Sequence, residues 1–252
     1  MRDAMKILIL DTCGAAASVV FAETEPRQEV VAAATLPGRT ASERLVATIR
    51  QLAATVEGGL QSVGAVAVVD GPGSFTGVRI ALSAAKGLSE ALGVPLVGIS
   101  RLAVLAHLAA ANDATGRTVF ALLDAGRGEA YLGIYSSGEC VREALVTGAQ
   151  LLAAIAEAAS AGAATHIVVC ESKVAETFAE LKPEFIAEPT AADALALVHT
   201  RIQAKDFDDA ATIDANYLRR TDAEIFAKPA AGRAASRHVA SGESRQVGGG
   251  TA

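Results

Sequence analysis

Residues 70–88 read DGPGSFTGVRIALSAAKGL, which places three glycines between a run of small apolar residues and a segment of helical periodicity. A glycine-rich turn that enters a helix often binds phosphate, because the first backbone N–H groups of a helix have no partner inside it. The same turn also suits a tight strand-to-helix crossover that needs positive φ angles and close backbone approach. The stretch therefore predicts a strand, a turn and a helix, and it leaves phosphate binding and a purely structural role both open.

The spacing of the three glycines departs from two known phosphate-binding motifs. Gly71, Gly73 and Gly77 do not match the dinucleotide fingerprint G-x-G-x-x-G, because their spacing is one residue too long. A Walker A loop needs a lysine in the turn, and this turn contains none. We therefore predict at most a weak, vestigial nucleotide site, centred on this turn together with Asp11 and Thr12.

Hydrophobic periodicity predicts the same order of elements in both halves of the chain, namely three strands, a helix, a strand and a helix. A capping box formed by Thr40 and Glu43 is expected to start the first helix. In the first half we predict strands at 6–11, 16–23, 29–36, 65–70 and 95–100, and helices at 40–56, 76–92 and after Ser100. In the second half we predict strands within 118–138, 140–147 and 165–172, and helices at 149–161 and 190–204.

The two halves also open on similar motifs. LILDTCG at residues 8–14 and ALLDAGRG at residues 121–128 each place an aspartate after an apolar strand and before a turn of small residues. This repetition predicts an α/β protein of two related lobes, 1–104 and 105–229, with mixed sheets flanked by helices and a cleft between them. Residues 230–252 contain almost no large apolar side chains, which predicts a disordered tail.

Composition and charge narrow the functional classes. The chain has 252 residues and a net charge of −6, so affinity for nucleic acid over its whole surface is not expected. Its three cysteines are far apart, which argues against a disulfide framework. No apolar run approaches the ~18 residues that span a bilayer, and the N-terminus lacks the core of a signal peptide. These features predict a soluble, cytoplasmic protein without a membrane partner.

Five stretches carry a resemblance to a known family. They are MKILILDT at 5–12, GRTASERLVATI at 38–49, the glycine turn with its helix at 70–88, RGEAYLGIY at 127–135 and NYLRR at 216–220. Together they closely resemble the TsaB (YeaZ) family of bacterial tRNA threonylcarbamoyladenosine biosynthesis proteins, in order from about residue 5 to residue 229. Ala41 departs from the pattern, because the family usually carries histidine there, and the resemblance does not extend into the tail.

The resemblance implies a duplicated actin/sugar-kinase/Hsp70-like (ribonuclease H-like) fold and a supporting role. Members of the family lack the metal site of the related catalytic subunit TsaD and act as its partner. With TsaE, that complex transfers a threonylcarbamoyl group from an adenylate to adenosine 37 of tRNAs that read codons beginning with A. By resemblance we expect no intrinsic activity, no tightly bound cofactor, use of ATP or ADP and Mg²⁺ by the complex, and a homodimer when TsaD is absent.

The resemblance also implies that the partner packs on the first two helices of the N-terminal lobe, 40–56 and 76–92. The first helix carries two apolar stripes, and one stripe is enough to pack a helix on its own sheet. The alternative is that every apolar position on these helices belongs to the core. The predicted interface residues are Leu45, Val46, Ile49, Ala53, Val78, Leu82 and Ala85.

A rival function is ATP-dependent phosphotransfer, in which Asp11, Asp70 and Asp124 at strand ends would hold Mg²⁺. Acidic residues at strand ends are also common as turn residues. The four histidines lack the spacing of metal ligands, and Ser74 lies outside a G-x-S-x-G context. Cys13 fits a small buried residue better than a nucleophile. We therefore predict neither a catalytic residue nor a metal site.

Overall fold

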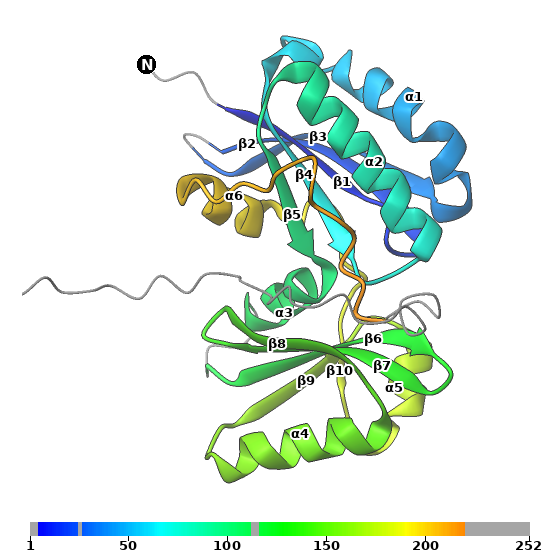
Figure 1. The fold of residues 1–252 in the computed structure, drawn as a ribbon, viewed down its shortest axis with the longest axis vertical. Coiled ribbons are helices and arrows are strands. Elements are labelled where there is room, and N and C mark those ends of the chain that lie inside the picture. Colours follow the sequence, from blue (N-terminus) through cyan, green and yellow to red (C-terminus); the bar gives the residue numbers. More distant parts are fainter. Residues whose placement is uncertain (1–4, 25–26, 112–115, 220–252) are drawn as a thin grey trace, which may run out of the picture. The chain divides into compact units, whose positions relative to one another are not determined.

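The computed structural model describes residues 5–24, 27–111 and 116–219, and the predicted tail 230–252 lies outside these ranges. Two five-stranded sheets organise the described residues (Figure 1). The first sheet contains β1 (Lys6–Asp11), β2 (Ala16–Glu23), β3 (Glu29–Pro37), β4 (Val63–Gly71) and β5 (Leu96–Ser100). The second contains β6 (Thr118–Gly126), β7 (Glu129–Ser136), β8 (Glu139–Val146), β9 (Thr165–Val169) and β10 (Glu184–Phe185).

Six α-helices accompany these strands within the described ranges. They are α1 (Ala41–Ala53), α2 (Phe75–Leu92), α3 (Arg101–Ala111), α4 (Gly148–Ser160), α5 (Ser172–Thr177) and α6 (Leu195–Gln203). Three short 3₁₀ turns, η1 (Gly38–Thr40), η2 (Gly59–Ser62) and η3 (Ala179–Leu181), complete the regular structure there. Helices α1 and α2 lie on one face of the first sheet, and α4 lies on one face of the second (Figure 1).

The two sheets have the same strand order. The first runs β3-β2-β1-β4-β5, and the second, read from its other edge, runs β8-β7-β6-β9-β10. In each sheet the first three strands in sequence pair antiparallel, and the last two join in parallel. The predicted duplication into two α/β halves with mixed sheets is therefore confirmed, and the topology shows it more clearly than the residues do.

One helix from each half packs against the sheet of the other half. The helix α3 follows the first sheet, but its Leu102 and Leu105 pack in a buried cluster with Val119 and Leu123 of β6. The helix α6 follows the second sheet, and its Val198 belongs to the buried cluster of the first. Apolar burial of this kind is the main stabilising term in folding, so the exchange ties the two halves together. The predicted lobe division at residue 104 falls inside α3.

Helix starts differ from the predicted ones in two places. The helix α1 begins after Thr40, but the Thr40 hydroxyl donates to the carbonyl of Pro37 at 2.9 Å and makes no capping bond. The predicted capping box at Thr40 is therefore wrong. A capping box is present at α4, where Thr147 and Gln150 bond reciprocally. The predicted helix 190–204 begins only at Leu195.

Within the described ranges, no helix combines the length and the hydropathy that crossing a membrane requires.

Candidate functional site

Two equivalent turns mark the place where each sheet presents an aspartate. Asp11 ends β1, and its carboxylate accepts the N–H of Cys13 at 2.8 Å. Asp124 lies near the end of β6, and its carboxylate accepts the N–H of Gly126 at 2.9 Å. Both aspartates thus close the same two-residue turn, which is a common role for this side chain.

The glycine turn packs directly against the first of these turns. The N–H of Ser74 donates to the carbonyl of Cys13 at 2.8 Å, and the Thr12 hydroxyl donates to the carbonyl of Gly77. A Cβ atom added at Gly77 would lie 2.0 Å from the Thr12 carbonyl oxygen, and one at Gly73 would lie 2.5 Å from that of Cys13. Two of the three glycines are therefore required by close contact between backbones.

The start of α2 is capped from within the chain. Ser74 is the N-cap residue of α2, and its hydroxyl accepts the N–H of Gly77 at 3.2 Å. This contact satisfies one of the helix's N-terminal donors that a phosphate would otherwise bind. The structure brings the five predicted nucleotide-site residues together, at the junction of β1, β4 and α2, but it joins several of them by contacts inside the protein. Nucleotide binding at these residues stays a prediction.

A buried arginine lies beside both aspartate turns. The side chain of Arg101, at the start of α3, is 1% exposed. Its Nη2 donates to Glu188 Oε1 at 2.6 Å, and its Nη1 lies 3.6 Å from Glu171 Oε1. Glu188 Oε1 also accepts the N–H of Ala15 at 2.9 Å, and Glu171 Oε2 accepts the N–H of Asp124 at 2.5 Å. Each turn therefore binds a glutamate through one backbone N–H.

Burial and charge move the pKa values of this cluster in different directions. Burial raises the pKa of Asp11, although the Cys13 N–H and Arg101 act against it. Burial also raises the pKa of Glu171. Burial alone would lower the pKa of Arg101, but Asp11 and the other acidic groups around it raise that pKa overall. The guanidinium therefore stays charged and can hold an anion at this point.

Asp124 behaves in the opposite way from Asp11. Burial would raise its pKa, but the hydrogen bond from Lys173 at 2.6 Å and the N–H of Gly126 together lower it. Lys173 belongs to α5, which starts directly after Glu171.

The two cysteines near Arg101 are buried thiols. Cys13 donates through its Sγ to the carbonyl of Val69 at 3.2 Å. Burial raises the pKa of Cys13 well above its ordinary value, and it raises the pKa of Cys170 to about 12. Since the thiolate is the nucleophilic form, neither position is suited to nucleophilic catalysis.

A second polar cluster, centred on Glu143, links the two halves. Ser100 donates to Glu143 Oε1 at 2.5 Å, and the Tyr135 hydroxyl donates to the same oxygen. The side chain of Asn216 donates to Glu143 Oε2 at 2.6 Å. Burial and the adjacent Glu143 carboxylate raise the pKa of Tyr135 well above its ordinary value. Ser100 also accepts the N–H of Leu102 and so caps the start of α3, the helix that was predicted to follow it.

Sequence reasoning missed the main charged residues of this region. Arg101 and Glu171 each stand at the end of an apolar strand pattern, PLVGIS and THIVVC, and that position was the signal that could have found them. Glu188 lies in a connector without regular structure and carries no comparable signal.

The predicted interface residues divide into one exposed residue and six buried ones. Val46 is 64% exposed on the outer face of α1. The other six lie in the buried core cluster of the first sheet: Leu45, Ile49, Ala53, Val78, Leu82 and Ala85. At these six positions the burial is what the core alternative expects, whereas Val46 is open to a partner. The interface itself stays a prediction.

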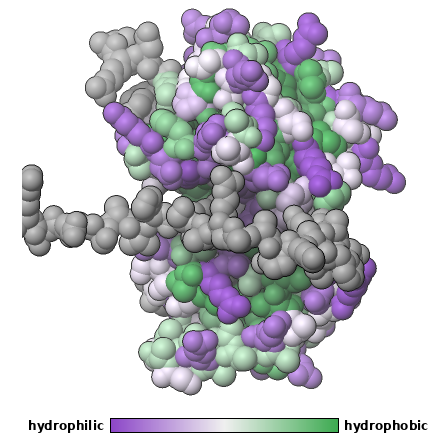
Figure 2. Space-filling view, in the orientation of Figure 1, coloured by the Kyte–Doolittle hydropathy of each residue, from purple (hydrophilic) through white to green (hydrophobic). Residues whose placement is uncertain are grey.

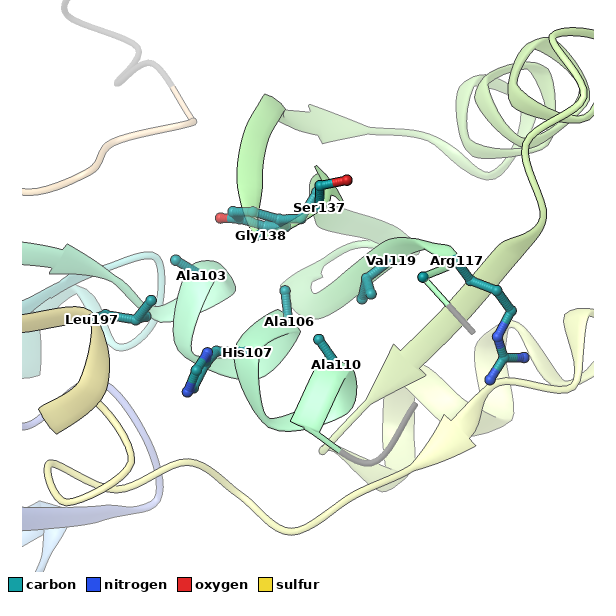
Figure 3. Close-up of a pocket in the computed structure, with 11 residues that line it drawn as sticks. Ala103, Ala106, His107, Ala110, Arg117, Val119, Ser137, Gly138 and Leu197 are labelled. Atoms are coloured by element: carbon teal, nitrogen blue, oxygen red, sulfur yellow. The ribbon is translucent and has the colours of Figure 1, made fainter. Parts of the chain in front are cut away.

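A cavity of ≈ 190 Å³ lies between α3 and the turn that joins β7 to β8. In Figure 3, Ala103, Ala106 and Ala110 face Ser137 and Gly138, whereas the His107 ring points away from them. A ligand site usually adds several converging polar groups to an apolar wall, and this arrangement lacks that convergence among the residues that the figure labels. None of the predicted site residues lines this cavity.

Metal binding has no support from the described part of the chain, where no three histidine, cysteine, aspartate or glutamate side chains are grouped to hold an ion. His166 is buried and contacts Glu184 at 2.6 Å, while His107 and His199 lie on helices α3 and α6. His238 falls outside the described residues.

Comparisons with known proteins identify the family. The family model for TsaD, tRNA N6-adenosine threonylcarbamoyltransferase, matches residues 34–247. The tRNA threonylcarbamoyladenosine biosynthesis protein TsaB of Escherichia coli (strain K12) is 34% identical over 135 residues, which are 54% of this chain and 57% of that protein. The TsaB of Haemophilus influenzae is 35% identical over 127 residues, 50% of this chain and 52% of that protein. The chain thus spans little more than half the length of these curated relatives.

Solved structures agree with the sequence matches. A Pseudomonas aeruginosa protein described as similar to peptidase YEAZ superimposes with a TM-score of 0.66 at 28% identity, over 85% of this chain and 100% of that one. YeaZ from Pseudomonas aeruginosa superimposes with a TM-score of 0.61 at 27% identity, over 82% of this chain and 98% of that one. With the duplicated strand order, these matches confirm the predicted actin/sugar-kinase/Hsp70-like fold. The chain belongs to the TsaB (YeaZ) branch of the TsaD-related family.

Proposed function

We propose that this chain is a non-catalytic subunit in the formation of N6-threonylcarbamoyladenosine at position 37 of tRNAs that read codons beginning with A. It partners TsaD, and TsaE completes the complex. The observation that carries the proposal is the combined similarity to curated TsaB proteins and to the TsaD family model over residues 34–247. Because tRNA is the substrate of the complex, the chain acts in the cytoplasm and contacts tRNA only through that complex.

The contacts around Asp11 favour the role of a non-catalytic subunit over that of a phosphotransferase. The carboxylate that would orient Mg²⁺ in a kinase of this fold is 3% exposed and already accepts the N–H of Cys13. Mg²⁺ keeps several waters and binds carboxylates that solvent and phosphate can reach. A buried aspartate beside a buried arginine is a poor ligand for such an ion. ATP or ADP and Mg²⁺ therefore belong to the complex, and this chain holds no tightly bound cofactor.

The outer face of α1 and α2 is the surface on which we place TsaD, or a second copy when TsaD is absent. Val46 is exposed there, and so is Phe75 at the start of α2. The Arg79 guanidinium lies 3.5 Å from the centre of the Phe75 ring, which holds both side chains at the surface. Figure 2 shows hydrophobic patches between hydrophilic side chains over this part of the first lobe. Exposed aromatic, arginine and aliphatic side chains together are typical of protein interfaces.

Reconstitution tests the proposal directly. Purified chain, TsaD and TsaE from the same organism are mixed with tRNA, threonylcarbamoyl adenylate and ATP, and modified adenosine 37 is measured by mass spectrometry. We expect modification only when this chain is present, and a stable complex with TsaD in size-exclusion chromatography. Full modification without the chain would contradict the proposal. Metal-dependent ATP turnover by the isolated chain, abolished by Asp11→Ala, would instead establish the phosphotransferase.

A further inference from the structure

We propose that the Arg101 guanidinium and the N–H of Ala15 form an oxyanion-binding site that the Glu188 carboxylate closes from within the chain. An external oxyanion such as sulfate or phosphate binds there only when that carboxylate is removed. The proposal concerns contacts inside this chain and stands independently of its role in tRNA modification.

The β1–β2 turn is shaped to receive an anion. A Cβ atom at Gly14 would lie 2.0 Å from Glu188 Oε1 and 2.6 Å from Arg101 Nη2. The absence of a side chain at Gly14 therefore leaves the space in which the carboxylate lies. An N–H of the turn, from Ala15, points at the same oxygen at 2.9 Å. A backbone N–H and an arginine that converge on one anionic oxygen are the usual elements of an oxyanion site.

Arg101 has more capacity for anions than Glu188 uses. Its side chain is 1% exposed, and Glu188 contacts it through a single oxygen. Glu171 lies at 3.6 Å from Nη1, beyond hydrogen-bond distance, and Nε makes no hydrogen bond within the described part of the chain. A buried guanidinium is costly unless anions satisfy its donors. The guanidinium fork matches the geometry of carboxylate and phosphate alike, and a tetrahedral oxyanion offers more oxygens to the donors that Glu188 leaves unused.

The glutamate that closes the site is supplied by an irregular connector, which can be altered without touching a helix or strand. Glu188 lies between β10 and α6, and its side chain is 35% exposed. The connector is held on either side of Glu188 by the N–H of Ile186, which donates to Val169, and the N–H of Ala191, which donates to Ser18. Loss of the Glu188 side chain would therefore open the site to solvent and leave the connector attached.

Sulfate is the probe, because it remains a dianion over the whole working pH range. The variant Glu188→Ala is titrated with sodium sulfate by calorimetry, against sodium chloride at matched ionic strength, and the Ala15 amide is followed by ¹⁵N NMR. Since charge-assisted hydrogen bonds are about twice as strong as neutral ones, we expect sulfate to bind the variant at least about ten-fold more tightly than the wild type. The Ala15 amide should shift saturably in the variant and not in the wild type.

Three further variants distinguish two effects of Glu188→Ala: the opening of the site and the loss of one negative charge. Glu188→Gln retains an oxygen that accepts from Ala15 and Arg101, so it should stay closed and bind sulfate no better than the wild type. Glu180→Ala removes the same charge from the exposed 3₁₀ turn η3 and should behave as the wild type. Adding Arg101→Met to Glu188→Ala should abolish the gain. Sulfate also stabilises folded proteins in general. The chloride titration and the Glu180→Ala variant are the controls for that non-specific effect.

Circular dichroism verifies the fold of each variant. If Glu188→Ala does not fold, Glu188→Ser takes its place, since it opens the same space. A folded variant of either kind without a gain in sulfate binding overturns the proposal. So does equal binding by Glu188→Gln and Glu188→Ala, or a saturable shift of the wild-type Ala15 amide in sulfate, which needs no variant.

Discussion

The aspartate turns of the two halves share a backbone and differ in environment. Asp11 and Asp124 each accept an N–H two residues later, yet Asp11 is 3% exposed whereas the Asp124 side chain is 31% exposed. The difference comes from the helix that follows the fourth strand of each half. The helix α2 has 18 residues and begins against the Asp11 turn, whereas α5 has 6 residues and offers Lys173 to Asp124. Equivalent positions in a duplicated fold thus acquire opposite electrostatics from later segments.

The largest expected effect distinguishes the buried cation Arg101, which lies beside both turns, from the exposed cation Lys173, which bonds Asp124 of the second turn. Arg101→Met leaves Glu188 and the other acidic groups around it without their buried cation, and such a loss costs about 3–5 kcal/mol of the free energy of unfolding. Lys173→Met removes a cation whose side chain is 64% exposed, and exposed pairs contribute about 0–1 kcal/mol. Urea denaturation of both variants measures the two costs. Equal costs would erase the contrast between the turns.

The next effect concerns the close contact that buries the Asp11 turn. Gly77→Ala places a Cβ atom 2.0 Å from the backbone oxygen of Thr12, and forced overpacking of this kind costs about 1–3 kcal/mol. Gly87 lies in the same helix with no atom within 4 Å of an added Cβ, so Gly87→Ala should stabilise by about 0.5–1 kcal/mol.

Thermal unfolding of the two alanine variants therefore gives opposite signs. If Gly77→Ala were as stable as the wild type, the glycine turn would not be fixed by its contact with Thr12.

The pH dependence of stability should also separate the two aspartates. The pKa of Asp11 is raised, so the folded state binds its proton more tightly, and wild-type stability falls relative to Asp11→Asn as the pH rises above the ordinary value of 3.8. The pKa of Asp124 is lowered, so wild-type stability relative to Asp124→Asn is present above 3.8 and is lost as the pH falls through the lowered pKa. Denaturant unfolding across this range measures both slopes, and slopes of the same sign would refute the assignment.

The smallest change in the free energy of unfolding is expected for variants in the first helix of each half, α1 and α4. Val46 on α1 and Leu152 on α4 are 64% and 55% exposed, so changing either to glutamate should alter the free energy of unfolding by less than about 0.5 kcal/mol. Only Val46→Glu should weaken association with TsaD and self-association, because a charge buried in an interface is costly. Analytical ultracentrifugation measures both associations. Equal weakening by the two variants, or by neither, would move the interface away from α1.

Local pattern predicted most of the fold. Apolar periodicity placed most strands and helices within a few residues, because alternation and helical stripes reflect which side faces the core. It missed the short elements α5 and β10. The repeat of LILDTCG and ALLDAGRG predicted the duplication that the strand order displays. Pattern failed for the start of α1, where Thr40 bonds Pro37 and not the helix, because capping geometry depends on the path of the preceding chain.

The candidate site was predictable only in part. From the sequence alone follow most of the order of elements, the family, and the meeting of Asp11 and Thr12 with the glycine turn, since residues at neighbouring strand ends converge. The helix α5 and the strand β10 were not predicted. What fills that place depends on tertiary packing. Glu188 bonds Ala15 across 173 residues, and Arg101 is buried between carboxylates from both halves. Tertiary packing also decided that Val46 is exposed while Leu45 beside it is buried. Such contacts join segments that are distant in sequence, so no local pattern records them, and the free energy of burying a charge depends on all its neighbours at once.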